Sequence, residues 1–320
     1  MSVQKQMVFE NNDLSQNLYG PENCYVKLIA NLNQVQINVR GNQATIVGSE
    51  SHVDAVLSIL GELVKQLKKG RSLNMIDVQK TVENFKQGGL ENLQNLSAES
   101  VLISGQKSIR PKSQAQLEYM KSVEKNDIIF GVGPAGTGKT YLAMALGLSY
   151  LLQKKVKRII VTRPAVEAGE KLGFLPGNLE EKVDPYLRPV YDALYDFLEA
   201  EKVQKMFERN DIEIAPLAFM RGRTLSDAFI ILDEAQNTTS AQMKMFLTRV
   251  GQNTKAMISG DVTQVDLPPG QISGLVQAEA ILKGIEGISF CYFDDRDVVR
   301  HRLVREVIKA YESFNSRSHS

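Results

Sequence analysis

The sequence predicts an α/β protein in which a doubly wound, mostly parallel sheet follows a small α+β domain. Two observations lead to this prediction. From residue 113 onward, short apolar runs alternate with segments of helical periodicity, the pattern of a parallel sheet covered on both faces. Before residue 72, alternating apolar residues around a turn indicate a hairpin flanked by helices.

The small domain is expected over residues 1–71, where the apolar pattern changes between helical and strand periods. We expect a helix at 25–32, strands at 35–39 and 44–47 joined by a turn at 40–42, and a helix at 51–69 that ends at Gly70. Residues 72–112 read as a helical connector with one helix at 75–86. Residues 113–313 form the α/β domain, and the polar tail 314–320 is expected to be disordered.

Six apolar runs supply the expected strands of the α/β domain, at 128–132, 159–162, 212–217, 228–232, 256–259 and 288–293. Overall composition is ordinary for a globular protein, with 43% hydrophobic and 23% charged residues. The 38 Lys and Arg residues nearly balance the 37 Asp and Glu residues, so any nucleic-acid binding would need a local basic patch.

Cysteine usage and the N-terminus favour a cytoplasmic protein. Cys24 and Cys291 are far apart in sequence and are expected to be free thiols in a reducing compartment. The three histidines show no metal-ligand spacing. The first residues lack the profile of a signal peptide, and no apolar stretch reaches the ~18 residues that a membrane span needs.

A complete phosphate-loop motif follows the first expected strand of the α/β domain. It consists of Gly133, Pro134, Ala135, Gly136, Thr137, Gly138, Lys139 and Thr140. The glycines let backbone N–H groups surround phosphate oxygens, Lys139 adds positive charge, and the Thr140 hydroxyl can bind Mg²⁺. The helix that starts there points its positive end at the same anion. The motif therefore predicts a nucleotide, ATP, with Mg²⁺.

Two acidic residues end the strand at 228–232. Asp233 is expected to hold Mg²⁺ together with Thr140, and Glu234 to orient or deprotonate an attacking water. The following strand ends in Gly-Asp-Val-Thr-Gln, so Asp261 and Gln264 are expected near the terminal phosphate, where they would sense it. The alternative for this second segment is a plain turn, because Gly-Asp also suits turns.

Three further contacts are predicted outside these motifs. Gln116 could recognise adenine, since an amide matches its donor and acceptor edge, although a surface glutamine is the alternative. Arg300 could act as an arginine finger in a neighbouring subunit, with Arg296 in reserve, or both could lie on a solvated helix face. In the loop 163–177, Arg163 and Lys171 could contact nucleic-acid phosphates and Phe174 could stack on a base. Packing of that loop on a neighbouring subunit is the alternative.

Several blocks together resemble the PhoH-like proteins, a family of cytoplasmic ATPases with a RecA-like core similar to that of superfamily 1 helicases. One matching block is the phosphate-loop segment that ends at Thr140. The others span residues 167–177, 184–189, 231–237 and 260–268. The N-terminal domain is similar to a KH-like module, although the loop reads Gly20-Pro21-Glu22-Asn23 where that module has Gly-x-x-Gly.

The resemblance implies an ATPase that couples hydrolysis to RNA binding or remodelling, including RNA helicase activity in ribosomal RNA processing beside a YbeY-type endoribonuclease. Because a single RecA-like core needs a partner to close over the nucleotide, a homo-oligomeric ring, a hexamer, is expected. Two alternatives stay open: a nucleotide-gated RNA-binding switch that unwinds nothing, and a phosphotransferase acting on an acceptor other than water.

Overall fold

The structure of the chain is a computed structural model that describes residues 2–98, 100–104, 107–164, 188, 190–299 and 307. These residues form two compact units. Unit 1 comprises residues 2–98, 111–114, 299 and 307, and unit 2 comprises the described residues of 100–110 and 115–298. Within the described residues, no helix is both long and apolar enough to cross a membrane.

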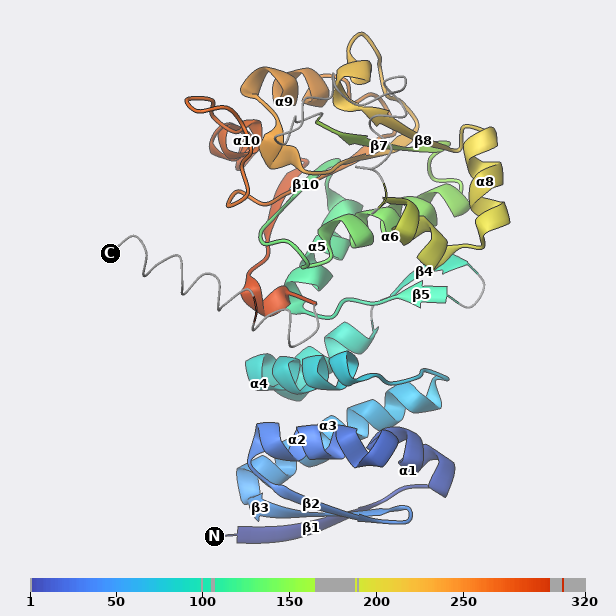
Figure 1. The fold of residues 1–320 in the computed structure, drawn as a ribbon, viewed down its shortest axis with the longest axis vertical. Coiled ribbons are helices and arrows are strands. Elements are labelled where there is room, and N and C mark those ends of the chain that lie inside the picture. The colour runs from blue at the N-terminus through green and yellow to red at the C-terminus, as the bar shows by residue number, and fades with distance from the viewer. Residues whose placement is uncertain are drawn as a thin grey trace. The chain divides into compact units, whose positions relative to one another are not determined.

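Unit 1 is a three-stranded antiparallel sheet covered by helices (Figure 1). Its elements are β1 (Ser2–Val8), α1 (Asn12–Tyr19), α2 (Cys24–Asn33), β2 (Gln36–Arg40), β3 (Gln43–Ser49), α3 (Glu50–Lys68) and α4 (Met75–Ala98). The strand order is β1-β3-β2. Unit 1 thus runs as a strand, two helices, two strands and two further helices, and the short segment Pro21–Asn23 joins α1 to α2.

The sequence analysis predicted the hairpin and the helices α2 and α3, but it missed β1 and α1. β1 alternates between half-buried and exposed residues and pairs with β3 from end to end. α1 begins where the Asn11 side chain accepts a hydrogen bond from the Leu14 N–H at 2.8 Å, a cap that satisfies one backbone donor. α4, which the sequence assigned to a connector, places Val78 and Val82 in the core of unit 1.

Unit 2 contains a six-stranded parallel sheet in the order β11-β6-β10-β9-β7-β8. The strands are β6 (Ile128–Val132), β7 (Arg158–Arg163), β8 (Ile212–Pro216), β9 (Ala228–Leu232), β10 (Lys255–Gly260) and β11 (Ile288–Tyr292). The hairpin β4 (Val101–Ser104) and β5 (Lys107–Ile109) lies apart from this sheet. The helices are α5 (Gln114–Lys125), α6 (Lys139–Leu152), α8 (Ala200–Glu208), α9 (Ser240–Leu247) and α10 (Gly274–Leu282), and residues 190–197 are also helical.

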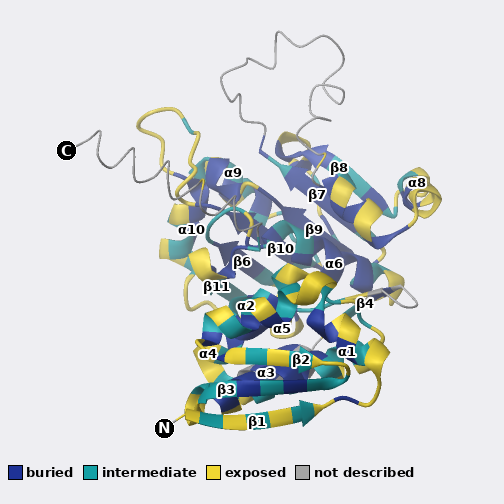
Figure 2. Cartoon of the chain, turned by 60° about the horizontal axis from the view of Figure 1, so that its bottom comes forward, coloured by how far each residue is buried: buried dark blue, intermediate teal, exposed yellow. Residues whose placement is uncertain are grey.

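Alternate residues of each central strand enter different hydrophobic cores, so both faces of the sheet are covered. Phe229 and Ile231 of β9 belong to the core under α5 and α6, whereas Ile230 and Leu232 belong to the core under α9 and α10. Figure 1 shows these two layers of helices, and Figure 2 shows the central strands as buried. The predicted α/β fold class is confirmed, and all six expected strands are present. Because β10 separates the phosphate-loop strand from β9, the strand order is also that of a RecA-like sheet.

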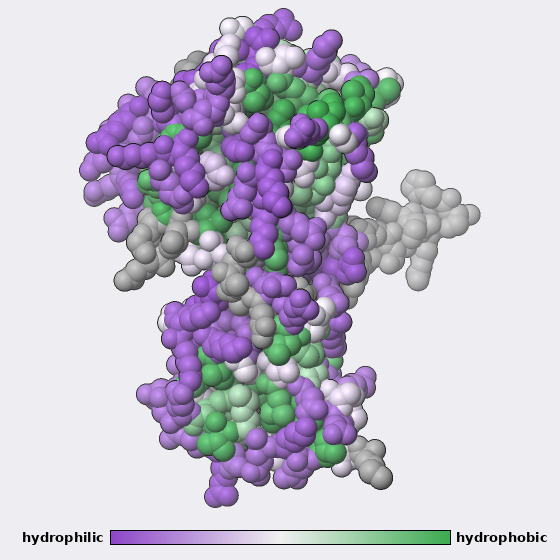
Figure 3. Space-filling model, turned by 180° about the vertical axis from the view of Figure 1, so that it is seen from behind, coloured by the Kyte–Doolittle hydropathy of each residue, from purple (hydrophilic) through white to green (hydrophobic). Residues whose placement is uncertain are grey.

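The face drawn in Figure 3 is largely hydrophilic, with hydrophobic side chains reaching the surface in places. In unit 2, exposed large apolar residues concentrate after β10, namely Val262, Val265, Ile272, Val276, Ile281 and Ile285. Cys24 and Cys291 are free and partly buried.

Candidate active site

The phosphate loop joins the end of β6 to the start of α6, as the motif requires. Gly133 and Gly138 both have positive φ, at 149° and 85°. At Gly133 a Cβ atom would lie 2.3 Å from the Phe293 carbonyl oxygen, so a larger residue would displace the backbone. Gly138 occupies the position before the first residue of α6 in the left-handed region, which glycine adopts without strain. The loop is therefore shaped by its own glycines.

Lys139 lies inside the loop. Its Nζ atom donates hydrogen bonds to the carbonyl oxygens of Gly133 at 2.7 Å and Pro134 at 2.8 Å, and the residue is buried. The Thr137 hydroxyl also donates to Pro134, at 3.0 Å. The ammonium group thus holds the loop in a curled form with a positive charge at its centre.

Asp233, directly after β9, links the loop to the neighbouring strands. Its Oδ1 atom accepts hydrogen bonds from the hydroxyls of Thr140, at 2.7 Å, and Ser259, at 2.8 Å. Its Oδ2 atom accepts from Nε of Arg163 at 2.9 Å, and from Nη2 of the same residue. The residue is 3% exposed. The structure therefore brings together Thr140 and Asp233, the two predicted Mg²⁺ residues.

These two residues suit Mg²⁺ as the sequence proposed. Because the Thr140 hydroxyl donates its proton to Asp233, its lone pairs are left for a cation. Mg²⁺ in nucleotide sites takes one or two protein oxygens and completes its shell with phosphate oxygens and water. Among the described residues there is no cluster of three His, Cys, Asp or Glu side chains that would hold a metal by itself. The oxygens of Thr140 and Asp233 would therefore fit a Mg²⁺ ion that is bound together with a nucleotide.

Glu234 lies two residues after the end of β9. Its φ of 54° is left-handed, and its side chain is exposed although its neighbours are buried. Its Oε2 atom accepts a hydrogen bond from Nε2 of Gln236 at 2.7 Å. The Oε1 atom of Gln236 accepts from the Asp261 N–H at 3.0 Å. Gln236 is 1% exposed, so its amide is a fixed bridge between the acid and the end of β10.

Sequence reasoning gave Gln236 no role. The available signal was an amide two residues after the acid at a strand end, where a side chain can turn back toward that acid. The partner, Asp261, is 25 residues away in sequence, and only the pairing of β9 with β10 brings it close.

Asp261 and Gln264 lie at the phosphate loop, as predicted for residues at adjacent strand ends. Asp261 Oδ2 accepts hydrogen bonds from the Ala135 N–H at 3.1 Å and from Gln264 Nε2 at 2.8 Å. The Thr263 hydroxyl donates to Oδ1 at 2.6 Å. One of the loop N–H groups that the motif offers to phosphate thus donates its hydrogen bond to a carboxylate. Sensing of the terminal phosphate by these residues stays a prediction.

Gln116 also contacts the loop. It is 3% exposed, not a surface glutamine, and its Nε2 atom donates to the Thr137 carbonyl oxygen at 2.8 Å. It therefore supports the loop from α5. Its contact with adenine stays a prediction.

The remaining predicted contacts are placed differently or lie outside the described residues. Arg163 is bonded to Asp233 at the site. Arg300, Lys171 and Phe174 lie outside the described residues. Arg296 is exposed and pairs with Asp294, with an Nε–Oδ2 distance of 3.0 Å.

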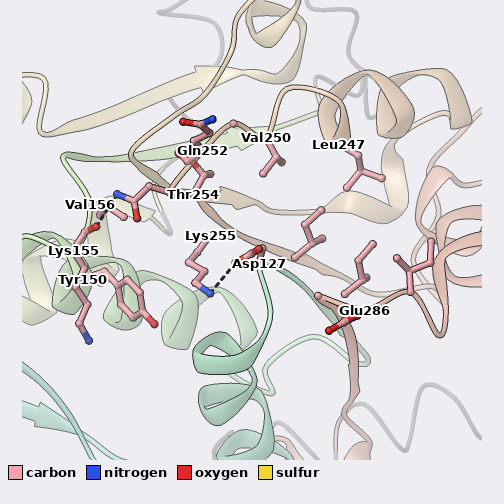
Figure 4. Close-up of a pocket in the computed structure, with 16 residues that line it drawn as sticks. Asp127, Tyr150, Lys155, Val156, Leu247, Val250, Gln252, Thr254, Lys255 and Glu286 are labelled. Atoms are coloured by element: carbon pink, nitrogen blue, oxygen red, sulfur yellow. Dashed lines mark hydrogen bonds and ion pairs between the residues drawn. The ribbon is translucent and has the colours of Figure 1, made fainter.

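A hollow of about 760 Å³ lies at the opposite end of the sheet (Figure 4). Its lining includes residues at the starts of β6, β10 and β11. There, Lys255 Nζ lies 3.0 Å from Asp127 Oδ1. Parallel α/β sheets bind ligands at the carboxyl ends of their strands. The hollow therefore lies away from the candidate site.

Comparisons with known proteins agree with the motifs. Residues 108–312 match the family model described as PhoH-like protein. A PhoH-like protein of Bacillus subtilis is 48% identical over 307 residues, covering 96% of each chain. One of Synechocystis is 49% identical over 276 residues, covering 86% of this chain and 84% of that one. Protein PhoH of Escherichia coli is 48% identical over 205 residues, or 63% and 58% of the two chains.

Among solved structures, the UvsW helicase of bacteriophage T4 matches with a TM-score of 0.35 and 16% identity. The match covers 63% of this chain and 65% of the helicase chain.

Proposed function

The chain belongs to the PhoH-like protein family, and from that premise we propose that it is a Mg²⁺-dependent ATPase that couples hydrolysis to RNA binding or remodelling. One observation carries the ATPase proposal. The Thr140 hydroxyl of the phosphate loop bonds the Asp233 carboxylate at 2.7 Å, and the exposed acid Glu234 follows Asp233 directly. The proposed phosphate-binding, metal-binding and base residues thus lie at the carboxyl ends of β6 and β9, on either side of β10.

Each residue then has a defined role in hydrolysis. Lys139 neutralises the outer phosphates of ATP, and Thr140 and Asp233 hold the cation. Mg²⁺ supplies charge compensation on the β- and γ-phosphates when bound. Glu234 accepts the proton of the water whose oxygen attacks the γ-phosphorus, so that ADP and phosphate are the products. Asp261 and Gln264 respond to the terminal phosphate, and Gln116 supports the loop and recognises adenine.

The RNA part of the proposal rests on the KH-like arrangement of unit 1. The loop between α1 and α2 carries Glu22, whose charge opposes a phosphate backbone, so we place the RNA contact outside that acidic position. We further propose a homo-oligomeric ring, a hexamer, in which Arg300 of a neighbouring subunit compensates the leaving phosphate, and a YbeY-type endoribonuclease as partner in ribosomal RNA processing. In this scheme the protein acts in the cytoplasm.

The test is the steady-state ATPase rate with and without single-stranded RNA. We expect hydrolysis in the wild type and stimulation by RNA. Glu234→Gln should lose at least about 10²-fold in kcat while still binding ATP, because a general base contributes about 10²–10⁴. Lys139→Ala should lose ATP binding itself. Glu213→Gln, which changes an acid on β8, is the matched control and should keep its rate.

The outcomes separate the alternatives. Wild-type protein without hydrolysis contradicts the ATPase proposal, and a rate that RNA leaves unchanged contradicts the coupling. RNA affinity that depends on ATP without unwinding would identify a nucleotide-gated switch. Transfer of the γ-phosphate to an acceptor other than water would identify a phosphotransferase.

A further inference from the structure

The Asp233 carboxylate has no unused acceptor capacity. An ionised carboxylate has about four lone-pair sites. Thr140 and Ser259 donate to Oδ1, and the guanidinium of Arg163 donates to Oδ2 through Nε and Nη2. The Thr140 bond is the one that a bound cation would keep, because it leaves the hydroxyl lone pairs available. The guanidinium on Oδ2 is the group that would compete with a cation in the proposed nucleotide-bound site.

Strand pairing fixes Arg163 at this position. β7 lies beside β9, with Thr162 opposite Leu232, and the Asp233 N–H donates to the Thr162 carbonyl oxygen at 3.0 Å. The next residue of each strand therefore carries one member of the ion pair. A neighbouring-strand arginine directly opposite the metal-binding acid requires no movement of the backbone to reach it.

Burial makes the guanidinium necessary when the cation is absent. The Asp233 and Arg163 side chains are 5% and 14% exposed. A buried carboxylate without a compensating charge is strongly unfavourable, and removing one member of a buried pair leaves that cost behind. Arg163 therefore compensates the charge of Asp233, and for the same reason it opposes the approach of another cation to Oδ2.

We propose that Arg163 occupies the Asp233 carboxylate in place of Mg²⁺ and must release Oδ2 when Mg²⁺ binds with nucleotide, so that Arg163 sets the Mg²⁺ concentration at which nucleotide binds. The inference rests on the proposed function, because it needs a nucleotide site at the phosphate loop. It assigns Arg163 a positioning role that is distinct from the contact with nucleic-acid phosphates expected from the sequence.

The experiment titrates Mg²⁺ into metal-free protein with a fluorescently labelled ADP and follows binding by anisotropy. For Arg163→Gln we expect the Mg²⁺ midpoint of ADP binding to fall about tenfold, because the uncompensated carboxylate attracts the cation more strongly. The same variant without metal should melt at a lower temperature than the wild type and regain most of the difference when Mg²⁺ and ADP are added.

The matched control is Arg223→Gln. Arg223 also forms a two-bond pair with an acid, Glu213, with Nη2 2.8 Å from Oε2, at β8. Loss of that pair should leave the Mg²⁺ midpoint unchanged. If Arg163→Gln does not fold, Arg163→Lys serves in its place, because lysine keeps the charge but lacks the fork of two donors; its midpoint should fall a few-fold.

Two results would overturn the inference. One is a Mg²⁺ midpoint of ADP binding for Arg163→Gln that is equal to or above that of the wild type. If Arg163→Gln does not fold, the same result for Arg163→Lys would overturn it. The other is weaker ADP binding at every Mg²⁺ concentration with the same midpoint, which would mean that Arg163 contacts phosphate directly. Failure of the wild type to bind ADP at any Mg²⁺ concentration would instead remove the proposed function, and this inference with it.

Discussion

Replacement of Gln236 by alanine tests how the position of Glu234 is maintained. The Gln236 side chain makes two hydrogen bonds, from Nε2 to Glu234 Oε2 at 2.7 Å and from the Asp261 N–H to Oε1 at 3.0 Å. Alanine removes both and leaves the backbone unchanged. The substitution therefore separates the orientation of the acid from the acid itself.

The two lost bonds differ in energy because their partners differ in exposure. Asp261 is buried, so its N–H is left without an acceptor, at about 1–3 kcal/mol. Glu234 is exposed and its carboxylate can hydrate, so this loss adds no more than about 1 kcal/mol. The expected destabilisation is therefore about 1–4 kcal/mol. The expected loss in kcat is roughly tenfold or more, below the about 10²–10⁴ that a general base contributes, because Glu234 is still present.

Urea unfolding measures the first effect, and ATPase kinetics with a separate determination of kcat and KM measure the second. Gln242→Ala is the matched control. Gln242 also accepts a hydrogen bond from a backbone N–H, that of Thr239 at 2.8 Å, but it belongs to the capping box of α9. It should lose about 1 kcal/mol of stability and no kcat. Equal kcat for Gln236→Ala and wild type would refute the positioning role.

Two other predictions concern stability. Gly131→Ala should destabilise by about 1–3 kcal/mol in urea unfolding, because its Cβ would lie 2.9 Å from the buried Tyr119 ring. Gly61→Ala in α3, where nothing lies within 4 Å, should instead stabilise slightly; equal effects would contradict the packing argument. The hydrogen bond from Arg223 lowers the pKa of Glu213 below its ordinary 4.5. The contribution of this pair to the free energy of unfolding is therefore complete above pH 4.5 and is lost as the pH falls through the lowered pKa. The difference in unfolding free energy between wild type and Glu213→Gln should therefore shrink as the pH falls below 4.5, and a difference that stays constant would contradict this pH dependence.

The sheet of unit 2 was predictable because its central strands are buried on both faces. Each reads as a short apolar run, and β6 and β9 have the predicted bounds. The position of the phosphate loop between a strand and a helix, and that of Asp233 at a strand end, were predictable for a related reason. Both depend on local spacing, which can be counted along the chain.

The missed elements depend on contacts that no local pattern records. β1 exposes every second residue and includes Lys5, so its strand character depends on pairing with β3. In α4, the helix predicted at 75–86 is present, and the unpredicted part is a second helical segment that follows the non-helical φ/ψ at Gly88 and Gly89 and ends at Ala98. Gln236 was missed, and the pairing of Arg163 with Asp233 was not expected, because the partners of these residues are 25 and 70 residues away.

The position of β10 between β6 and β9 connects these distant residues into one path. Asp261 at the end of β10 contacts the Ala135 N–H on one side and the Gln236 amide on the other. Gln236 in turn contacts Glu234. The same strand order therefore joins the phosphate loop to the Glu234 carboxylate through the side chain of Asp261, its backbone N–H and the buried Gln236 amide.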